Sequence, residues 1–92
     1  MSQQIIVADD ESLVRGLVTA TLSTYYPNAT IKQAADGQSL VAQVREESID
    51  VVLTDNSMPN LTGIEATREI RSFNTTVPIY ILSGDVRERG FI

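Results

Sequence analysis

Short runs of apolar residues alternate along the chain with segments of helical periodicity, and this alternation limits the possible folds more than any other feature. The runs cover residues 5–8, 29–35, 49–54 and 77–82. The second run is the most polar of the four, so it suits the edge of a sheet, whereas the others are typical of strands buried on both faces. Strands that alternate with helices predict an α/β fold with a parallel sheet between two helical layers.

The segments between the runs have the spacing of amphipathic helices. We expect one helix over residues 12–26, ended by Pro27, a second over residues 39–47, and a third that begins with a capping box of Thr62 and Glu65. Residues 85–92 have the character of a fourth helix start. The apolar stripes expected to pack are Leu13, Val14, Leu17, Val18, Leu22 and Tyr25 in the first helix, Leu40, Val41 and Val44 in the second, and Ala66, Ile70 and Phe73 in the third. Tyr26 and Tyr80 are also expected to serve packing.

Composition excludes several classes of site. The 92 residues include no histidine and no cysteine, which excludes a histidine-bound zinc, a Ser-His-Asp triad, a thiolate nucleophile and a disulfide framework. A formal net charge of −5 disfavours direct binding to nucleic acid or to an anionic membrane. No segment has the roughly 18 apolar residues that a membrane span needs, and no signal peptide precedes the first run. We therefore expect a single cytoplasmic domain over residues 1–92.

Oxygen-bearing side chains follow three of the four apolar runs, in the order Asp9 and Asp10, then Asp55, then Ser83. Because the carboxyl ends of parallel strands meet at one edge of a sheet, we expect these side chains to lie close together. Three neighbouring carboxylates repel one another unless they are protonated or neutralised by a cation. Oxygen ligands favour a hard cation, and Mg²⁺ fits best. A bound Mg²⁺ would also allow an anion such as phosphate to approach.

Each of these residues also has a simpler interpretation. Asp9 and Asp10 are common residue types at the start of a helix. Asp55 is compatible with an ordinary loop, and Ser83 with a turn hydroxyl. Their common place at the predicted functional edge is what favours a site over these separate explanations.

The same residues resemble a known family, the receiver domain of two-component response regulators. The resemblance extends from Ile5 to Gly84 and rests on three groups of residues: Asp9-Asp10, then Asp55-Asn56-Ser57-Met58-Pro59 followed by Gly63, then Ser83-Gly84. It implies a doubly wound, flavodoxin-like parallel sheet.

The resemblance implies a role for each site residue. Asp55 would be the phosphoacceptor, taking a phosphoryl group from a phosphohistidine of a partner histidine kinase or phosphotransfer protein. Asp9, Asp10, Asp55 and the backbone carbonyl of Ser57 would hold Mg²⁺. Ser83 would donate a hydrogen bond to the phosphoryl group. Such a domain is a signalling switch and not a turnover enzyme.

The chain departs from the family pattern at its C-terminal end. Receivers have five strand–helix units, and at a spacing of about 25 residues a fifth strand would begin beyond Ile92. That strand carries the family's lysine, and Lys32 on the second run cannot replace it. The fourth strand would then be an exposed apolar edge, so we expect self-association as a dimer, by edge pairing, by helix exchange or by borrowing elements from a second copy. Alternatively, the sequence is a truncated version of a longer regulator.

Two other functions stay open from the residues alone. The first is an interaction or dimerisation module of receiver fold that is not phosphorylated. The second is a Mg²⁺-dependent aspartyl phosphatase. Enzymes of the second kind usually have an Asp-x-Asp nucleophile motif, and Asp55-Asn56-Ser57 lacks its second aspartate.

Overall fold

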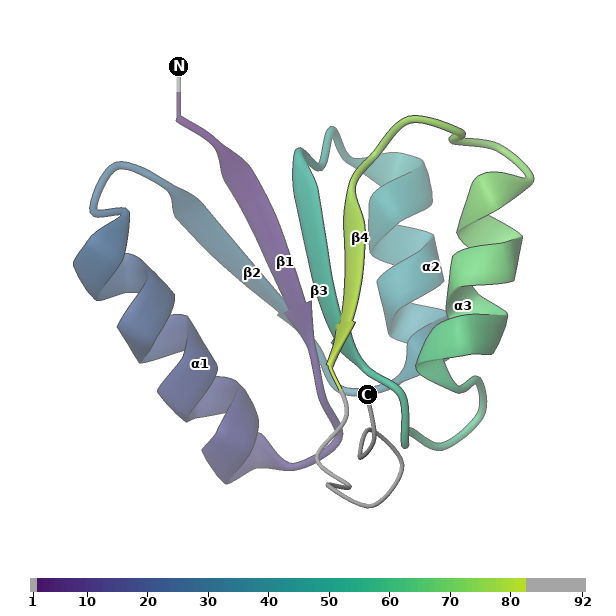
Figure 1. Ribbon diagram of the computed structural model, residues 1–92, viewed down its shortest axis with the longest axis horizontal. Coiled ribbons are helices and arrows are strands. Elements are labelled where there is room, and N and C mark those ends of the chain that lie inside the picture. The colour runs from purple at the N-terminus through teal and green to yellow at the C-terminus, as the bar shows by residue number, and fades with distance from the viewer. Residues whose placement is uncertain (1, 83–92) are drawn as a thin grey trace, which may run out of the picture.

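A parallel sheet with a helix layer on each face forms the body of the molecule (Figure 1). The computed structural model describes residues 2–82. Its strands and helices are, in chain order, β1 (Gln4–Ala8), α1 (Ser12–Tyr25), β2 (Thr30–Ala34), α2 (Gly37–Glu46), β3 (Val51–Asp55), α3 (Gly63–Arg71) and β4 (Ile79–Leu82). The strand order is β2-β1-β3-β4, which confirms the α/β prediction and the edge position of the second strand.

The described elements match the predicted part of the flavodoxin-like fold. They comprise four strands and three helices, as expected for a chain that holds the first units of a five-unit receiver. The predicted fourth helix start, residues 85–92, lies outside the described residues. Among the helices that the structure describes, none has the length and apolar character needed to cross a membrane.

The strand register brings the predicted site together. β1 lies at the centre of the sheet, where Ala8 is the partner of Ala34 on β2 and of Thr54 on β3. The residues that follow Ala8 and Thr54 therefore leave the sheet at the same edge. This arrangement places Asp9, Asp10 and Asp55 next to one another.

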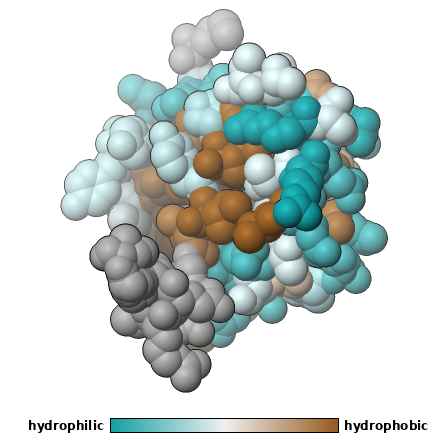
Figure 2. All heavy atoms as spheres, turned by 45° about the vertical axis from the view of Figure 1, so that its right-hand side comes forward, coloured by the Kyte–Doolittle hydropathy of each residue, from teal (hydrophilic) through white to brown (hydrophobic). Residues whose placement is uncertain are grey.

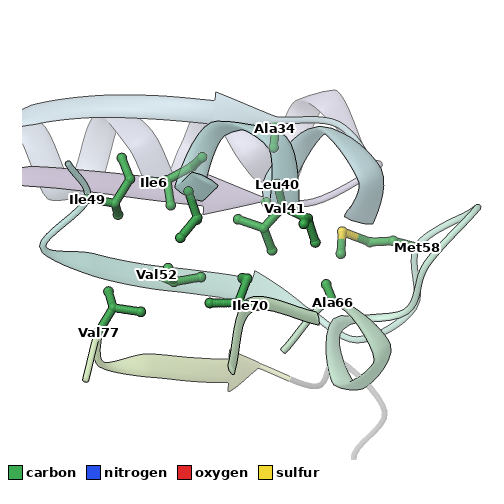
Figure 3. Packing of buried hydrophobic residues seen from close by; sticks show 12 residues of the cluster. Ile6, Ala34, Leu40, Val41, Ile49, Val52, Met58, Ala66, Ile70 and Val77 are labelled. Atoms are coloured by element: carbon green, nitrogen blue, oxygen red, sulfur yellow. The ribbon is translucent and has the colours of Figure 1, made fainter. Parts of the chain in front are cut away.

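The hydrophobic core lies between the sheet and the α2–α3 helix pair (Figure 3). Ile6 of β1, Leu40 of α2 and Ile70 of α3 are completely buried there. The burial of Leu40 and Ile70 agrees with the apolar stripes predicted for their helices. The cluster consists of Ile6, Ala8, Ala34, Leu40, Val41, Val44, Ile49, Val52, Met58, Ala66, Ile70 and Val77. These residues hold β1 and β3 in place beneath the candidate site.

Several predicted boundaries shift by one or two residues for local reasons. α2 begins at Gly37 instead of residue 39, because the Asp36 carboxylate accepts a hydrogen bond from the Ser39 N–H at 2.7 Å and so caps the helix earlier. The fourth strand begins at Ile79 instead of residue 77. The predicted capping box of Thr62 and Glu65 is present at the start of α3, with both of its hydrogen bonds.

The prediction that the apolar stripe of α1 packs was wrong for most of the stripe, in which only Val18 and Leu22 are half-buried. No residue of α1 is buried, and Leu13 and Leu17 are 88% and 69% exposed. Tyr25 and Tyr26 at its end are also largely exposed, as is Tyr80 on β4, which corrects their expected packing role. Among the described elements α1 is the sole helix on its face of the sheet, so only its inner side is covered (Figure 1).

Candidate functional site

Asp9 and Asp10 occupy the turn that joins β1 to α1, and the main chain of this turn is held at several points. The Asp9 N–H donates to the Ala34 carbonyl at 3.0 Å, which extends the pairing of β1 with β2 by one residue. The Glu11 N–H donates to Asp9 Oδ1 at 2.9 Å. The Asp9 side chain is half-buried and that of Asp10 is exposed.

Asp55 is the last residue of β3, and the loop that follows it is closely packed. A Cβ atom on Gly63 would lie 2.5 Å from the Asp55 carbonyl oxygen, so only glycine allows this approach of α3 to β3. The Asn56 side chain accepts a hydrogen bond from the Ile64 N–H at 3.0 Å, and the Asn56 carbonyl accepts from the Gly63 N–H at 3.0 Å. The start of α3 therefore fixes the backbone beside Asp55.

The rest of this loop is fixed by the core and by α2. Met58 is buried in the hydrophobic cluster, so its side chain packs the loop against the core. Asn60 adopts a positive φ of 70°, a conformation that asparagine tolerates better than most residues, and its side chain donates to Asp36 Oδ2 at 3.2 Å. Ser57, the residue whose carbonyl was predicted as a metal ligand, is exposed between these anchors.

The three carboxylates form one cluster. Asp9, Asp10 and Asp55 each offer an oxygen atom, and these atoms lie within 4.8 Å of one another. Burial raises the pKa of Asp55 above its usual value of 3.8, and the negative charges of Asp9 and Asp10 raise it further. Hydrogen bonds from the backbone N–H groups of Asn56 and Ser57 oppose this rise in the pKa.

This donor set fits a hard divalent cation. It consists of carboxylate oxygens alone, the ligand type that Mg²⁺ and Ca²⁺ prefer. Burial contributes most to the raised pKa of Asp55, and the negative charges of Asp9 and Asp10 add a part that a bound cation would relieve. Ser83, the remaining predicted site residue, lies outside the described residues.

Sequence reasoning missed three residues that shape the site. Arg15 donates from Nη1 to the Asp9 carbonyl, and the Asn56 and Asn60 side chains anchor the loop after Asp55. The position of Arg15 in the first turns of the helix after the acidic pair was a usable signal. The contact between Asn60 and Asp36 joins two distant loops and leaves no local pattern.

The fold and the acidic cluster define an α/β domain with a candidate cation site at the carboxyl edge of its sheet. The family model of the response regulator receiver domain matches residues 5–90. The chain therefore belongs to the response regulator receiver domain family, which supplies the signalling modules of two-component systems.

Curated relatives support this assignment. The two-component response regulator ORR41 of Oryza sativa subsp. japonica is 33% identical over 84 residues, which is 89% of this chain and 66% of that protein. The response regulator UvrY of Escherichia coli K12 is 34% identical over 79 residues, covering 86% of this chain and 36% of that protein. The chain thus spans about two thirds or less of the length of these relatives.

Solved structures show the same arrangement. The response regulator TrrA of Thermotoga maritima, in complex with Mg²⁺ and BeF, superposes with a TM-score of 0.86 at 27% identity over 98% of this chain and 76% of that one. The receiver domain of a sensor histidine kinase of Pseudomonas aeruginosa PAO1 gives a TM-score of 0.85 at 28% identity, over 94% of this chain and 70% of that one. That structure contains a magnesium ion coordinated in its active site cleft.

Proposed function

We propose that this chain is a phosphoacceptor domain that receives a phosphoryl group on Asp55 from the phosphohistidine of a sensor histidine kinase or a phosphotransfer protein. The observation that carries the proposal is the cluster of Asp9, Asp10 and Asp55, whose oxygens lie within 4.8 Å at the edge of a receiver-family sheet. The 92 residues contain no histidine, so the donor histidine lies outside this sequence.

In the proposed reaction, a carboxylate oxygen of Asp55 attacks the phosphorus atom of the donor. A P–O bond to Asp55 forms while the P–N bond to the donor imidazole breaks, and the imidazole regains a proton. The chain's own part is to hold Asp55 in place. Its carbonyl packs against Gly63, and the backbone N–H groups of Asn56 and Ser57 lower the pKa of its carboxylate, which favours the charged form.

Asp9, Asp10, Asp55 and the carbonyl of Ser57 would hold Mg²⁺. When bound, the ion would offset the negative charge of the carboxylates and of the transferred phosphoryl group. The proposed role of Ser83 is to donate a hydrogen bond to that group. The net charge of −5 argues against direct contact of this domain with nucleic acid.

The test is formation of an adduct with beryllofluoride, a mimic of the phosphoryl group. ¹⁹F NMR of the full chain should show bound fluoride resonances with beryllium, fluoride and Mg²⁺ together, and none without Mg²⁺. Asp55→Asn should abolish the bound resonances. Glu69→Gln is the matched control, because it removes one negative charge from an exposed position on α3 and should leave them unchanged. Bound resonances in Asp55→Asn would refute the assignment of Asp55.

A second candidate function is supported by the edge of the sheet. Within residues 2–82, β4 is a terminal strand, and Tyr80, Ile81 and Leu82 are 57%, 40% and 48% exposed. Hydrophobic side chains are visible on the side of the molecule where β4 and α3 lie (Figure 2). We propose that two copies pair antiparallel through β4, an arrangement that keeps their acidic edges apart.

Light scattering after size-exclusion chromatography tests this pairing. The chain should elute as a dimer, and Tyr80→Lys should shift it toward the monomer. Thr76→Lys adds the same charge in the exposed loop before β4 and should leave the dimer intact. A wild-type chain that is folded and monomeric would rule out the pairing. The Asp55→Ala variant separates the two candidate functions. If it binds a partner protein as tightly as the wild type does, phosphorylation of Asp55 is not needed, and an interaction module that is not phosphorylated replaces the phosphoacceptor.

A further inference from the structure

Arg15 links the acidic turn to the neighbouring strand. Its Nη1 donates to the Asp9 carbonyl at 2.6 Å, and its Nε donates to Gln33 Oε1 at 2.9 Å. Arg15 is half-buried on α1, whereas the other described contacts of the acidic turn come from the backbone. One guanidinium therefore joins β2 to the turn between β1 and α1.

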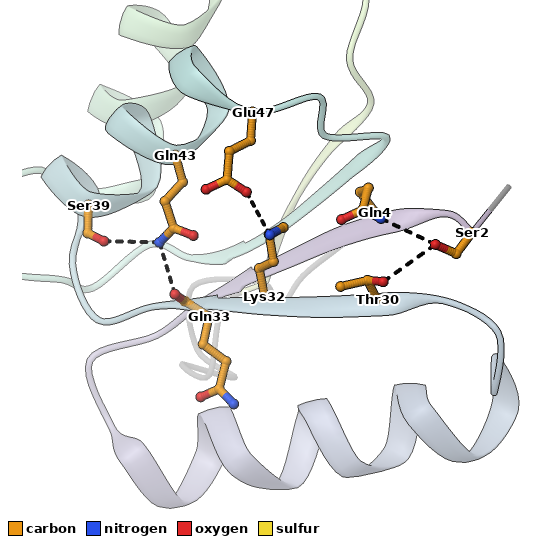
Figure 4. A network of polar contacts seen from close by, with 8 residues as sticks. All are labelled: Ser2, Gln4, Thr30, Lys32, Gln33, Ser39, Gln43 and Glu47. Atoms are coloured by element: carbon orange, nitrogen blue, oxygen red, sulfur yellow. Dashed lines mark hydrogen bonds and ion pairs between the residues drawn. The ribbon is translucent and has the colours of Figure 1, made fainter.

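The backbone of Gln33, the residue that accepts from Arg15 Nε, is held by a contact with α2. Its carbonyl accepts a hydrogen bond from Gln43 Nε2 of α2 at 2.9 Å. Its side chain points to the α1 face of the sheet, while Lys32 points to the other face and pairs with Glu47 at 2.7 Å (Figure 4). The contact between Gln33 and Arg15 thus ties the acidic turn to a strand that α2 also holds.

Asp9 forms hydrogen bonds through three of its atoms. The N–H pairs with Ala34, Oδ1 accepts from the Glu11 N–H, and the carbonyl accepts from Arg15. The carbonyl belongs to the peptide group that leads to Asp10. Its direction therefore decides where the Asp10 carboxylate lies relative to Asp55.

We propose that Arg15 is a positioning residue that orients the Asp9–Asp10 peptide for binding of a divalent cation. The inference rests on the metal site of the proposed function. Outer contacts of this kind orient metal ligands, and their loss typically weakens metal binding about 10–100-fold. The planar fork of a guanidinium can bind two acceptors in fixed directions, which a lysine ammonium does not do.

A role in positioning and a role through charge predict opposite results. If Arg15 acted through its positive charge, its removal would make the acidic cluster more negative and strengthen cation binding. If Arg15 orients the peptide, its removal weakens binding despite the favourable change in charge. The sign of the effect therefore separates the two roles.

The experiment is calorimetric titration of the full chain with MgCl₂ and with CaCl₂. Arg15→Met should bind Mg²⁺ about tenfold more weakly than the wild type, and Arg15→Lys should fall between them. Ca²⁺ tolerates irregular ligand geometry better, so its affinity should fall less, and the preference for Mg²⁺ should shrink. Arg68→Met, which removes the same charge from an exposed position on α3, should bind Mg²⁺ like the wild type.

A second variant, Gln33→Ala, leaves Arg15 and all charges of the site in place. It tests the same role if Arg15→Met fails to fold. It should weaken Mg²⁺ binding less than Arg15→Met does, since Arg15 then loses one of its two acceptors. Equal or tighter Mg²⁺ binding by folded Arg15→Met would overturn the inference, as would unchanged binding by Gln33→Ala if Arg15→Met is unfolded. A wild-type chain that binds no Mg²⁺ would overturn the proposed metal site and this inference with it.

Discussion

The two faces of the sheet differ in how well their helices are held. On one face, α2 and α3 pack against each other and against β1 and β3, and they bury residues such as Leu40 and Ile70 completely. On the other face, α1 buries none of its residues, and Leu13 and Leu17 point largely into solvent. The helices of the first face also have side-chain caps, from Asp36 and Thr62, whereas the N-cap residue of α1, Glu11, forms no side-chain cap.

This difference between the two faces indicates which interactions position each part of the candidate site. The loop that follows Asp55 is fixed by the well-packed layer, through Gly63 and Met58. Asp9 leads into α1 and depends on individual hydrogen bonds, among them the one from Arg15. One half of the acidic cluster is thus positioned by packing and the other half by polar contacts.

Truncation of the apolar side chains should give the largest contrast between the two faces. Ile70→Ala leaves a cavity in a completely buried position and should lower the free energy of unfolding by about 2–5 kcal/mol. Leu17→Ala removes a side chain that is 69% exposed and should change it by about 0.5 kcal/mol or less. Urea unfolding followed by circular dichroism measures both. Equal losses would mean that α1 is as well packed as α3.

Alanine in place of glycine should act in opposite directions on the two faces. Gly63→Ala would place a Cβ 2.5 Å from the Asp55 carbonyl and should cost about 1–3 kcal/mol. Gly16→Ala meets nothing within 4 Å inside α1 and should stabilise the chain by about 0.5–1 kcal/mol through helix propensity. Thermal unfolding of the two variants provides the comparison. A destabilised Gly16→Ala would reveal a close neighbour of α1.

The helix caps should give a smaller contrast. Thr62→Ala removes the capping box of α3 and should cost about 1 kcal/mol. Glu11→Ser introduces a hydroxyl cap at the start of α1, where no side-chain cap exists, and should add about 0.5 kcal/mol. Urea midpoints are sensitive enough to resolve both changes. No gain from Glu11→Ser would indicate that the turn before α1 cannot accept a side-chain cap.

The pH dependence of stability should give the smallest contrast, and it isolates the half-buried carboxylate of Asp55. Folding raises the pKa of Asp55, so the folded state holds its proton more tightly than the unfolded state does. This contribution favours folding below pH 3.8 and is lost as the pH rises through the raised pKa. In the absence of divalent cations, Asp55→Asn should therefore be more stable than the wild type at neutral pH, and this gain should shrink toward low pH. A gain that is independent of pH would contradict the assigned cause.

The amino-acid sequence was enough to predict the sheet, its edge strand and the acidic cluster. The reason is that buried runs such as residues 5–8 report strands, and parallel strands bring their carboxyl ends to one edge. It did not predict the exposure of Leu13 and Leu17, because periodicity identifies the apolar side of a helix and not whether another element covers it. The contact of Arg15 with Gln33 and that of Asn60 with Asp36 escaped prediction because each joins segments distant in the sequence.

Chemical trapping of a phosphorylated residue tests directly whether Asp55 is the phosphoacceptor. The chain is incubated with a small phosphoryl donor such as acetyl phosphate and Mg²⁺, reduced with borohydride, and mapped by peptide mass spectrometry. Borohydride converts an acyl phosphate on Asp55 to homoserine, so we expect homoserine at this position, dependent on Mg²⁺ and absent without the donor. Homoserine at another aspartate, with Asp55 unchanged, would contradict this expectation.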